Sequence, residues 1–190
     1  MSFEVADPDF EERIRTSFVR QGLDEAIDAT LGHVAAGAVE IELPFSPGVS
    51  QQHGFFHGGV MGAIGDSACG YAAMTLTPPG AEVLTIEYKV NFVSPGRGHR
   101  LVARGRVLKP GRTVTVCASD VYAVSGVGDK LVATMLVTIM TVAGQRDMSP
   151  RSAETPAAGI PPTAIRWCPC RPLRGIRRLG YLRRTVPPSA

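Results

Sequence analysis

The residue best suited to chemistry is Asp66, an acid within a run of small and apolar side chains. Residues 58–74 contain no polar face, which predicts a helix that is buried on most sides. Burying a carboxylate without a partner is costly. Asp66 is therefore either an acid satisfied by the core or the helix surface, or a general base or nucleophile in a sheltered site.

The start of the same helix is a second candidate site. His57, Gly58 and Gly59 precede the apolar run, and a helix N-terminus presents unpaired N–H groups and partial positive charge. Glycines let a ligand reach these amides, which could then polarise a carbonyl and hold an oxyanion. As a bare tripeptide, the motif also fits an ordinary loop-to-helix transition.

The spacing of the two features constrains how they could act together. Gly58 and Asp66 are separated by about 12 Å if the segment between them is helical. One carbonyl carbon cannot contact both ends of that helix. If both act on it, the carboxylate comes from a second subunit with an antiparallel helix, which predicts a homodimer with two equivalent sites.

The remaining pattern predicts an α+β fold. We expect a helix capped by Asp7 and ending near Gly22, a short helix at 24–31, and a strand at 39–43 where apolar residues alternate with glutamates. After the central helix, turn residues separate four strand-like runs, at 83–92, 100–108, 113–124 and 130–142. One buried helix followed by an antiparallel meander argues against a doubly wound sheet.

These features together resemble a known family, the PaaI-like branch of the hot-dog-fold acyl-CoA thioesterases. The resemblance covers about residues 20–143. It is carried by Gln51, the His57-Gly58-Gly59 start, Asp66, and Thr85 in a strand that ends Asn91-Phe92-Val93-Ser94-Pro95. It implies a curved antiparallel sheet wrapped around one long central helix, a homodimer or a homotetramer built as a dimer of dimers, and no cofactor or metal.

The resemblance also implies a role for each matching residue. The Gly58 N–H would polarise the thioester carbonyl, and Gln51 would orient it. Asp66 of the opposite subunit would activate water or attack directly, and Thr85 would position the water. His57 would fix the loop, and we place it with Gly59 among the substrate-binding residues.

Coenzyme A needs cations for its phosphates. Arg97, Lys109 and Arg112 lie in turns where relatives contact the nucleotide, although ordinary solvated charges explain these residues equally well. Candidates for the acyl pocket are Phe55, Phe56, Met61 and Tyr71, which core packing explains just as well.

Composition divides the chain into three parts: an N-terminal helical segment at 1–31, a hot-dog domain at 32–143, and a disordered tail rich in proline and arginine at 144–190. The net charge of +3 comes from the tail, where nine arginines face two acidic residues. The tail is either a tether to nucleic acid or another acidic surface, or an extension without a selected role, and we favour the second, with no nucleic-acid partner.

Other features predict a cytoplasmic protein with no membrane partner. The N-terminus is acidic and lacks the apolar core of a signal peptide. The longest apolar run, of about thirteen residues, is shorter than a bilayer span. The four cysteines do not form a dense disulfide framework.

The function expected from these features is hydrolysis of acyl-CoA thioesters to free acid and coenzyme A. Two alternatives remain open. One is a hydratase or dehydratase acting on acyl thioesters, and the other is a non-catalytic acyl-CoA-binding or regulatory module.

Overall fold

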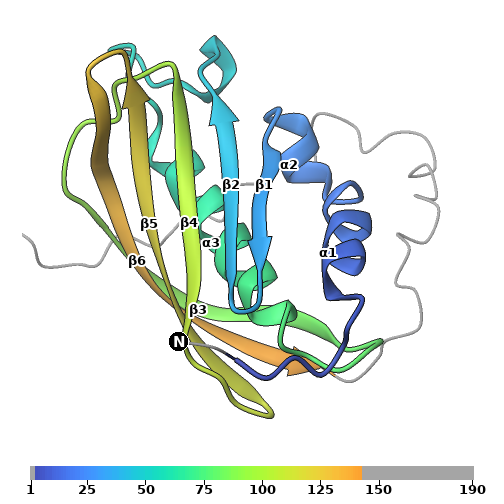
Figure 1. Ribbon diagram of the computed structural model, residues 1–190. Coiled ribbons are helices and arrows are strands. Elements are labelled where there is room, and N and C mark those ends of the chain that lie inside the picture. The colour runs from blue at the N-terminus through green and yellow to red at the C-terminus, as the bar shows by residue number, and fades with distance from the viewer. Residues whose placement is uncertain (1–2, 143–190) are drawn as a thin grey trace, which may run out of the picture. The chain divides into compact units, whose positions relative to one another are not determined.

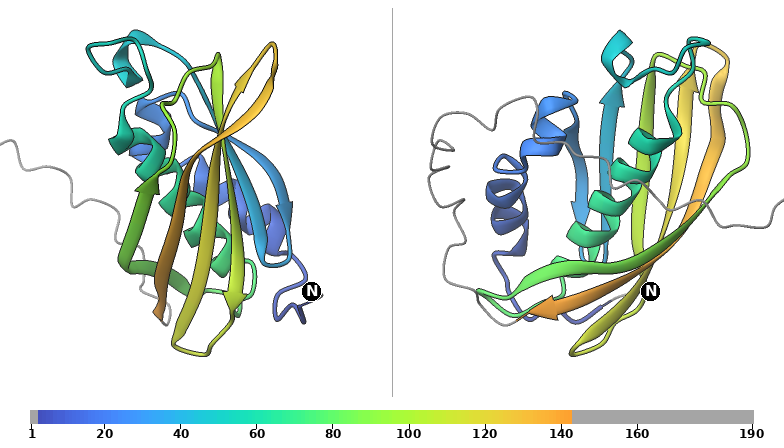
Figure 2. Two further views of the ribbon diagram at one scale, coloured as in Figure 1. Left: turned by 90° about the vertical axis from the view of Figure 1, so that its left-hand side faces the viewer. Right: turned by 180° about the vertical axis from the view of Figure 1, so that it is seen from behind.

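The small, apolar run forms helix α3 (Gly58–Met74), as predicted, and α3 lies in the hollow of a curved sheet (Figures 1 and 2). The computed structural model describes residues 3–142, so the predicted tail at 144–190 lies outside the described residues. Within residues 3–142, no helix is both long and apolar enough to cross a membrane.

The sheet is antiparallel and has six strands in the order β1-β2-β4-β5-β6-β3. They are β1 (Thr30–Ala35), β2 (Ala38–Pro44), β3 (Glu82–Phe92), β4 (Arg100–Lys109), β5 (Val114–Ser125) and β6 (Gly128–Val142). Apolar side chains of its inner face pack on α3 to form the core. The predicted α+β hot-dog fold is thereby confirmed.

Two features of the sheet differ from the predictions. Strand β3 does not continue into a meander with β4, but crosses to the far edge and pairs with β6. Strand β1 was missed, because its segment contains Gly32 and the exposed His33 and lacks a clear alternation of apolar and polar residues.

The N-terminal helices also differ from the predicted bounds. Helix α1 (Phe10–Phe18) follows Asp9 as N-cap, while the carboxylate of Asp7 accepts a hydrogen bond from the Asp9 amide and pairs with Arg13 at 2.9 Å. Helix α2 (Gly22–Ala26) is short, and the predicted helix at 24–31 is wrong beyond its first turn because β1 begins at Thr30. A single 3-10 turn (Pro47–Val49) interrupts the loop before α3.

Close contact between α3 and the sheet depends on glycine. A Cβ on Gly105 of β4 would overlap the backbone of Ala68 and Cys69 in α3, and one on Gly65 would overlap the sulfur of Met135 in β6. Glycines in α3 cost helix propensity, and we expected them to permit a close approach of the sheet. The closest backbone approach lies instead at Gly105, a glycine of the sheet, while Gly65 makes room for the Met135 side chain.

Arg13 joins α1 to the far end of α3. Its guanidinium donates to the carbonyl oxygens of Met74, Thr77 and Ala81 at 3.1–3.2 Å. The last carbonyls of a helix lack intrahelical partners and carry partial negative charge. A cation on α1 therefore terminates α3 and attaches the N-terminal segment to it.

We expect the substitution Gly105→Ala to lower the free energy of unfolding by about 1–3 kcal/mol, because the added methyl group must displace helix backbone. Urea denaturation measures this. Gly126→Ala is the matched control, since nothing lies within 4 Å of a Cβ there. Equal stability of the two variants would show that α3 is not seated on β4 as described.

Candidate active site

The N-terminus of α3 carries an uncommitted backbone donor. His57 is the N-cap residue, and its Nδ1 accepts a hydrogen bond from the Gly59 amide at 2.9 Å. The Val60 amide donates to the His57 carbonyl at 3.1 Å. Of these first amides, that of Gly58 alone has no hydrogen-bond partner among residues 3–142. His57 thus has the architectural contact expected of it, and Gly58 keeps a free N–H.

The loop before α3 contains Gln51 and is attached to the helix start, because the His57 amide donates to the Val49 carbonyl at 2.9 Å. Ser50 and Phe56 form an isolated β-bridge, and the Gln51 amide donates to the Phe55 carbonyl at 2.8 Å. The side-chain oxygen of Gln51 accepts from the His53 amide. Its side-chain nitrogen therefore remains as the donor for a ligand.

Asp66 lies two turns further along α3 and is held by β3. The Thr85 hydroxyl donates to Asp66 Oδ1 at 2.8 Å. A bulge makes this possible: Thr85 pairs with Ile139 and Glu87 with Thr138, so Ile86 is an extra residue in the ladder. The extra residue turns Thr85 toward the helix.

One face of α3 thus carries both predicted features. Gly58, Gly62 and Asp66 recur every four residues, which places them in one row along a helix. Rings from β3 cover the two glycines, since a Cβ on Gly58 would meet the Phe92 ring at 3.0 Å and one on Gly62 the Tyr88 hydroxyl at 3.4 Å. Tyr88 was not singled out from the sequence, because its inward direction depends on the bulge.

The environment of Asp66 suits a base. Partial burial raises the pKa of its carboxyl above the ordinary value, and the hydrogen bond from Thr85 lowers it in part. A carboxylate with a raised pKa and one fixed hydrogen bond is a better proton acceptor near neutral pH than a solvated one.

The predicted cationic residues do not gather in one place. The guanidinium of Arg97 lies over the Phe55 ring at 4.9 Å, and the neighbouring Gly96 carbonyl accepts from the Phe56 amide, so Arg97 lies beside the loop that contains Gln51. Lys109 and Arg112 lie at the opposite end of β4, about 30 Å away for a ten-residue strand.

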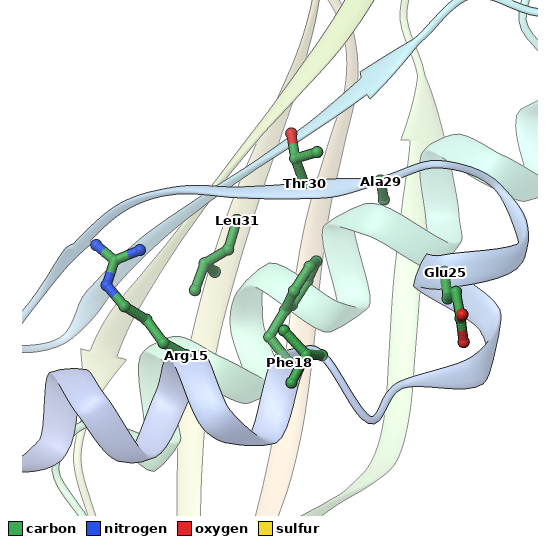
Figure 3. Close-up of a pocket in the computed structure, with 7 residues that line it drawn as sticks. Arg15, Phe18, Glu25, Ala29, Thr30 and Leu31 are labelled. Carbon is green, nitrogen blue, oxygen red and sulfur yellow. The ribbon is translucent and has the colours of Figure 1, made fainter.

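Most of the predicted acyl-pocket candidates are core residues. Phe56, Met61 and Tyr71 are only 2%, 3% and 5% exposed and belong to the hydrophobic core. A separate hollow of about 420 Å³ lies between α1, α2 and β1, lined by Phe18, Leu31 and five other residues, with Arg15 and Glu25 at its margins (Figure 3). None of the predicted site residues lines this hollow.

Comparison with known proteins identifies the family. Residues 53–129, which include His57, Gly58 and Asp66, match the model of the Thioesterase superfamily. A crystal structure of a thioesterase family protein from Silicibacter pomeroyi is 41% identical and covers 71% of this chain and 99% of its own, with a TM-score of 0.70. The chain therefore belongs to the thioesterase superfamily, and the predicted resemblance to hot-dog thioesterases is confirmed.

More distant structures share the fold. The PaaI protein of Escherichia coli, from the phenylacetic acid degradation operon, is 17% identical, covers 74% of this chain and 98% of its own, and has a TM-score of 0.65. A Saccharolobus solfataricus protein whose name describes an esterase is 30% identical over 90 residues; the match covers 47% of this chain and 64% of that relative's length. Family and fold support hydrolysis of a thioester as the general activity.

We expect Thr85→Val to raise the pKa of Asp66 further, because it removes the hydroxyl that stabilises the charged carboxylate. Carboxyl-carbon NMR followed through a pH titration measures this directly. Thr113→Val, at an exposed position, is the control. An unchanged or lowered pKa in the Thr85 variant would show that this hydrogen bond does not act on the charged form.

Proposed function

We propose that this protein hydrolyses acyl-CoA thioesters to free acid and coenzyme A at sites shared between two subunits. The observation that carries the proposal is the row on α3: a free Gly58 amide at one end and Asp66, held by Thr85, two turns away. A donor for an oxyanion and a sheltered carboxylate are the two groups that acyl transfer to water requires.

In the proposed reaction, Asp66 accepts a proton from water and the resulting hydroxide adds to the thioester carbonyl. The Gly58 N–H and the Gln51 amide bind the oxyanion that forms. Collapse of the tetrahedral intermediate breaks the carbon–sulfur bond, and the thiolate of coenzyme A leaves and takes up the proton that Asp66 accepted. Direct attack by Asp66 would instead expel the coenzyme A thiolate and form an anhydride, which water hydrolyses to the free acid and the Asp66 carboxylate.

A second copy of the chain is needed to complete this site, and β3 provides a surface for it. Within residues 3–142, strand β3 pairs with β6 alone, so its other edge is free in this part of the chain. Large apolar side chains on both faces of the sheet beside this edge are about half exposed: Leu84, Ile86, Tyr88, Phe92 and Leu136. A free edge flanked by exposed apolar side chains favours association with an identical edge about a two-fold axis.

The same symmetry would gather the separated cations. With antiparallel α3 helices, the β4–β5 turn of one subunit approaches the Gly58 end of the other. Lys109 and Arg112 would then join Arg97 of the second subunit around the phosphates of coenzyme A. We place the binding of the nucleotide there, with His57 and Gly59 shaping the helix start.

We expect Asp66→Ala to lower turnover at least about a hundredfold while leaving the oligomer intact. Asp66→Asn is the sharper variant, because its amide oxygen still accepts from Thr85 but cannot take a proton. Thiol release from a panel of aromatic and aliphatic acyl-CoAs measures the effect. Near-normal turnover in either variant would exclude Asp66 as base or nucleophile.

Thiol release by the wild type also separates the competing functions, because dehydration or hydration of the acyl chain liberates no thiol. His57 Nδ1 is occupied by the Gly59 amide, which speaks against a histidine acid paired with Asp66. Tight acyl-CoA binding with an intact thioester after long incubation would instead indicate a binding module.

We expect Gly58→Pro to remove the oxyanion donor and reduce kcat about 10²–10³-fold. Proline fits the first position of a helix, and the extended conformation of His57, with φ −67° and ψ 138°, suits a residue before proline. Gly58→Ala is the matched control, since it adds the same contact with Phe92 but keeps the N–H. Equal losses in the two variants would assign the effect to the ring contact.

Mixing two inactive variants tests whether sites are shared. In a mixed dimer of Gly58→Pro and Asp66→Ala subunits, one site carries both defects and the other carries neither. Random mixing should therefore restore about a quarter of wild-type activity, because half of the dimers contain one intact site. No recovery after verified subunit exchange would place both groups of a site in one subunit.

A further inference from the structure

A buried acid outside the site described above lies next to Asp66. Asp24 of α2 is 0% exposed, whereas Leu23 beside it is 55% exposed. A helix that only covered the core would bury the leucine and expose the carboxylate. In this helix the acid is buried and the leucine is exposed, although burying a polar group without hydrogen-bond partners costs free energy.

The contacts of Asp24 point to α3. Ser67 Oγ donates to Asp24 Oδ1 at 3.4 Å, and Oδ2 has no hydrogen-bond partner in the described part of the chain. No ion pair involves Asp24 within residues 3–142. The titratable groups of α3 that interact electrostatically with Asp24 are Asp66 and Tyr71.

The pKa values of both neighbouring carboxyls are raised. Burial raises the pKa of Asp24, the Ser67 hydrogen bond lowers it in part, and the charge of Asp66 raises it further. Burial also raises the pKa of Asp66. Both acids are thus held in surroundings that disfavour their charged forms.

Asp66 and Ser67 are adjacent in sequence but are held by different elements. Asp66 bonds to Thr85 of β3, and Ser67 bonds to Asp24 of α2. The turn of α3 that presents the carboxylate is thus attached on two sides. Rotation of this turn would move the Asp66 oxygens relative to a carbonyl held at the helix start of the second subunit.

We propose that Asp24 is a positioning residue of the thioesterase site: its buried carboxyl holds Ser67 and, through it, the turn of α3 that presents Asp66. This inference rests on the proposed function of Asp66. It makes α2 part of the active-site machinery, although α2 lies before the first strand.

Steady-state thiol release by the full-length chain tests the inference with a set of matched variants. Asp24→Ala removes the acceptor and Ser67→Ala removes the donor, and the double variant tests whether the two act as one unit. Asp24→Asn keeps the shape of a neutral acid and its acceptor oxygen. Glu25→Ala, the next residue on α2 and exposed, is the control.

We expect Asp24→Ala and Ser67→Ala each to lower kcat between about tenfold and a hundredfold, since a small misplacement of a reacting group has effects of this size. KM should change by less than about twofold because the contacts with the nucleotide remain, and the double variant should lose no more than the worse single variant. Asp24→Asn should restore most of kcat, and Glu25→Ala should match the wild type.

Three results would overturn the inference: wild-type kcat in both single variants, a loss confined to KM, or multiplied losses in the double variant. An Asp24→Asn enzyme as slow as Asp24→Ala would also do so.

If Asp24→Ala does not fold, as judged by circular dichroism, Ser67→Ala and Asp24→Asn decide the matter. If the wild type binds acyl-CoA but releases no thiol, the proposed function is refuted and this inference with it. If the wild type is active and the variants are unaffected, this inference alone is refuted.

Discussion

The seating of α3 against the sheet is the constraint on which the rest of the structure depends. The missing side chain of Gly105 in β4 lets strand backbone approach the backbone of α3, and Gly65 of α3 leaves room for the side chain of Met135. Glycines weaken the helix itself, so packing on the sheet must compensate for them. A helix seated so closely has little freedom to rotate or slide, and the groups along it are positioned correspondingly well.

One face of α3 carries both chemical groups, separated along the helix. The Gly58 amide has the partial positive charge of a helix N-terminus, while Asp66 lies beyond the first turn, where it does not cancel that charge. Within one subunit the two groups are too far apart to act on one carbonyl. The rings of Phe92 and Tyr88 on the edge strand β3 lie over the same row of α3, so the proposed second subunit would meet the site at this edge.

Local patterns in the sequence were sufficient to predict α3 to the residue and the four long strands to within two residues at each end. They also singled out Gly58 and Asp66, whereas Thr85, which donates to Asp66, came from the family resemblance. The order of the strands was not predictable in the same way, because the crossing of β3 to the edge depends on tertiary packing and leaves no periodic signal. The bulge at Ile86 depends on pairing with β6, so the direction of Tyr88 followed no visible pattern. Asp24 was not singled out for a different reason. An acid in a short helix is typical of the helix surface, and the burial of Asp24 is a property of the assembled fold.

The N-terminal segment gives the site its remaining rigidity. Arg13 binds the last carbonyl of α3, Asp24 contacts its middle through Ser67, and the His57 ring caps its first turn. A catalytic group lowers the activation barrier most when its surroundings need not reorganise during the reaction. A helix held at its start, middle and end meets that condition even though its own glycines make it weak. The acid, its hydrogen-bond donor and the helix start are therefore positioned by elements that lie far apart in the sequence, and α1 and α2 belong to the same mechanical unit as the sheet.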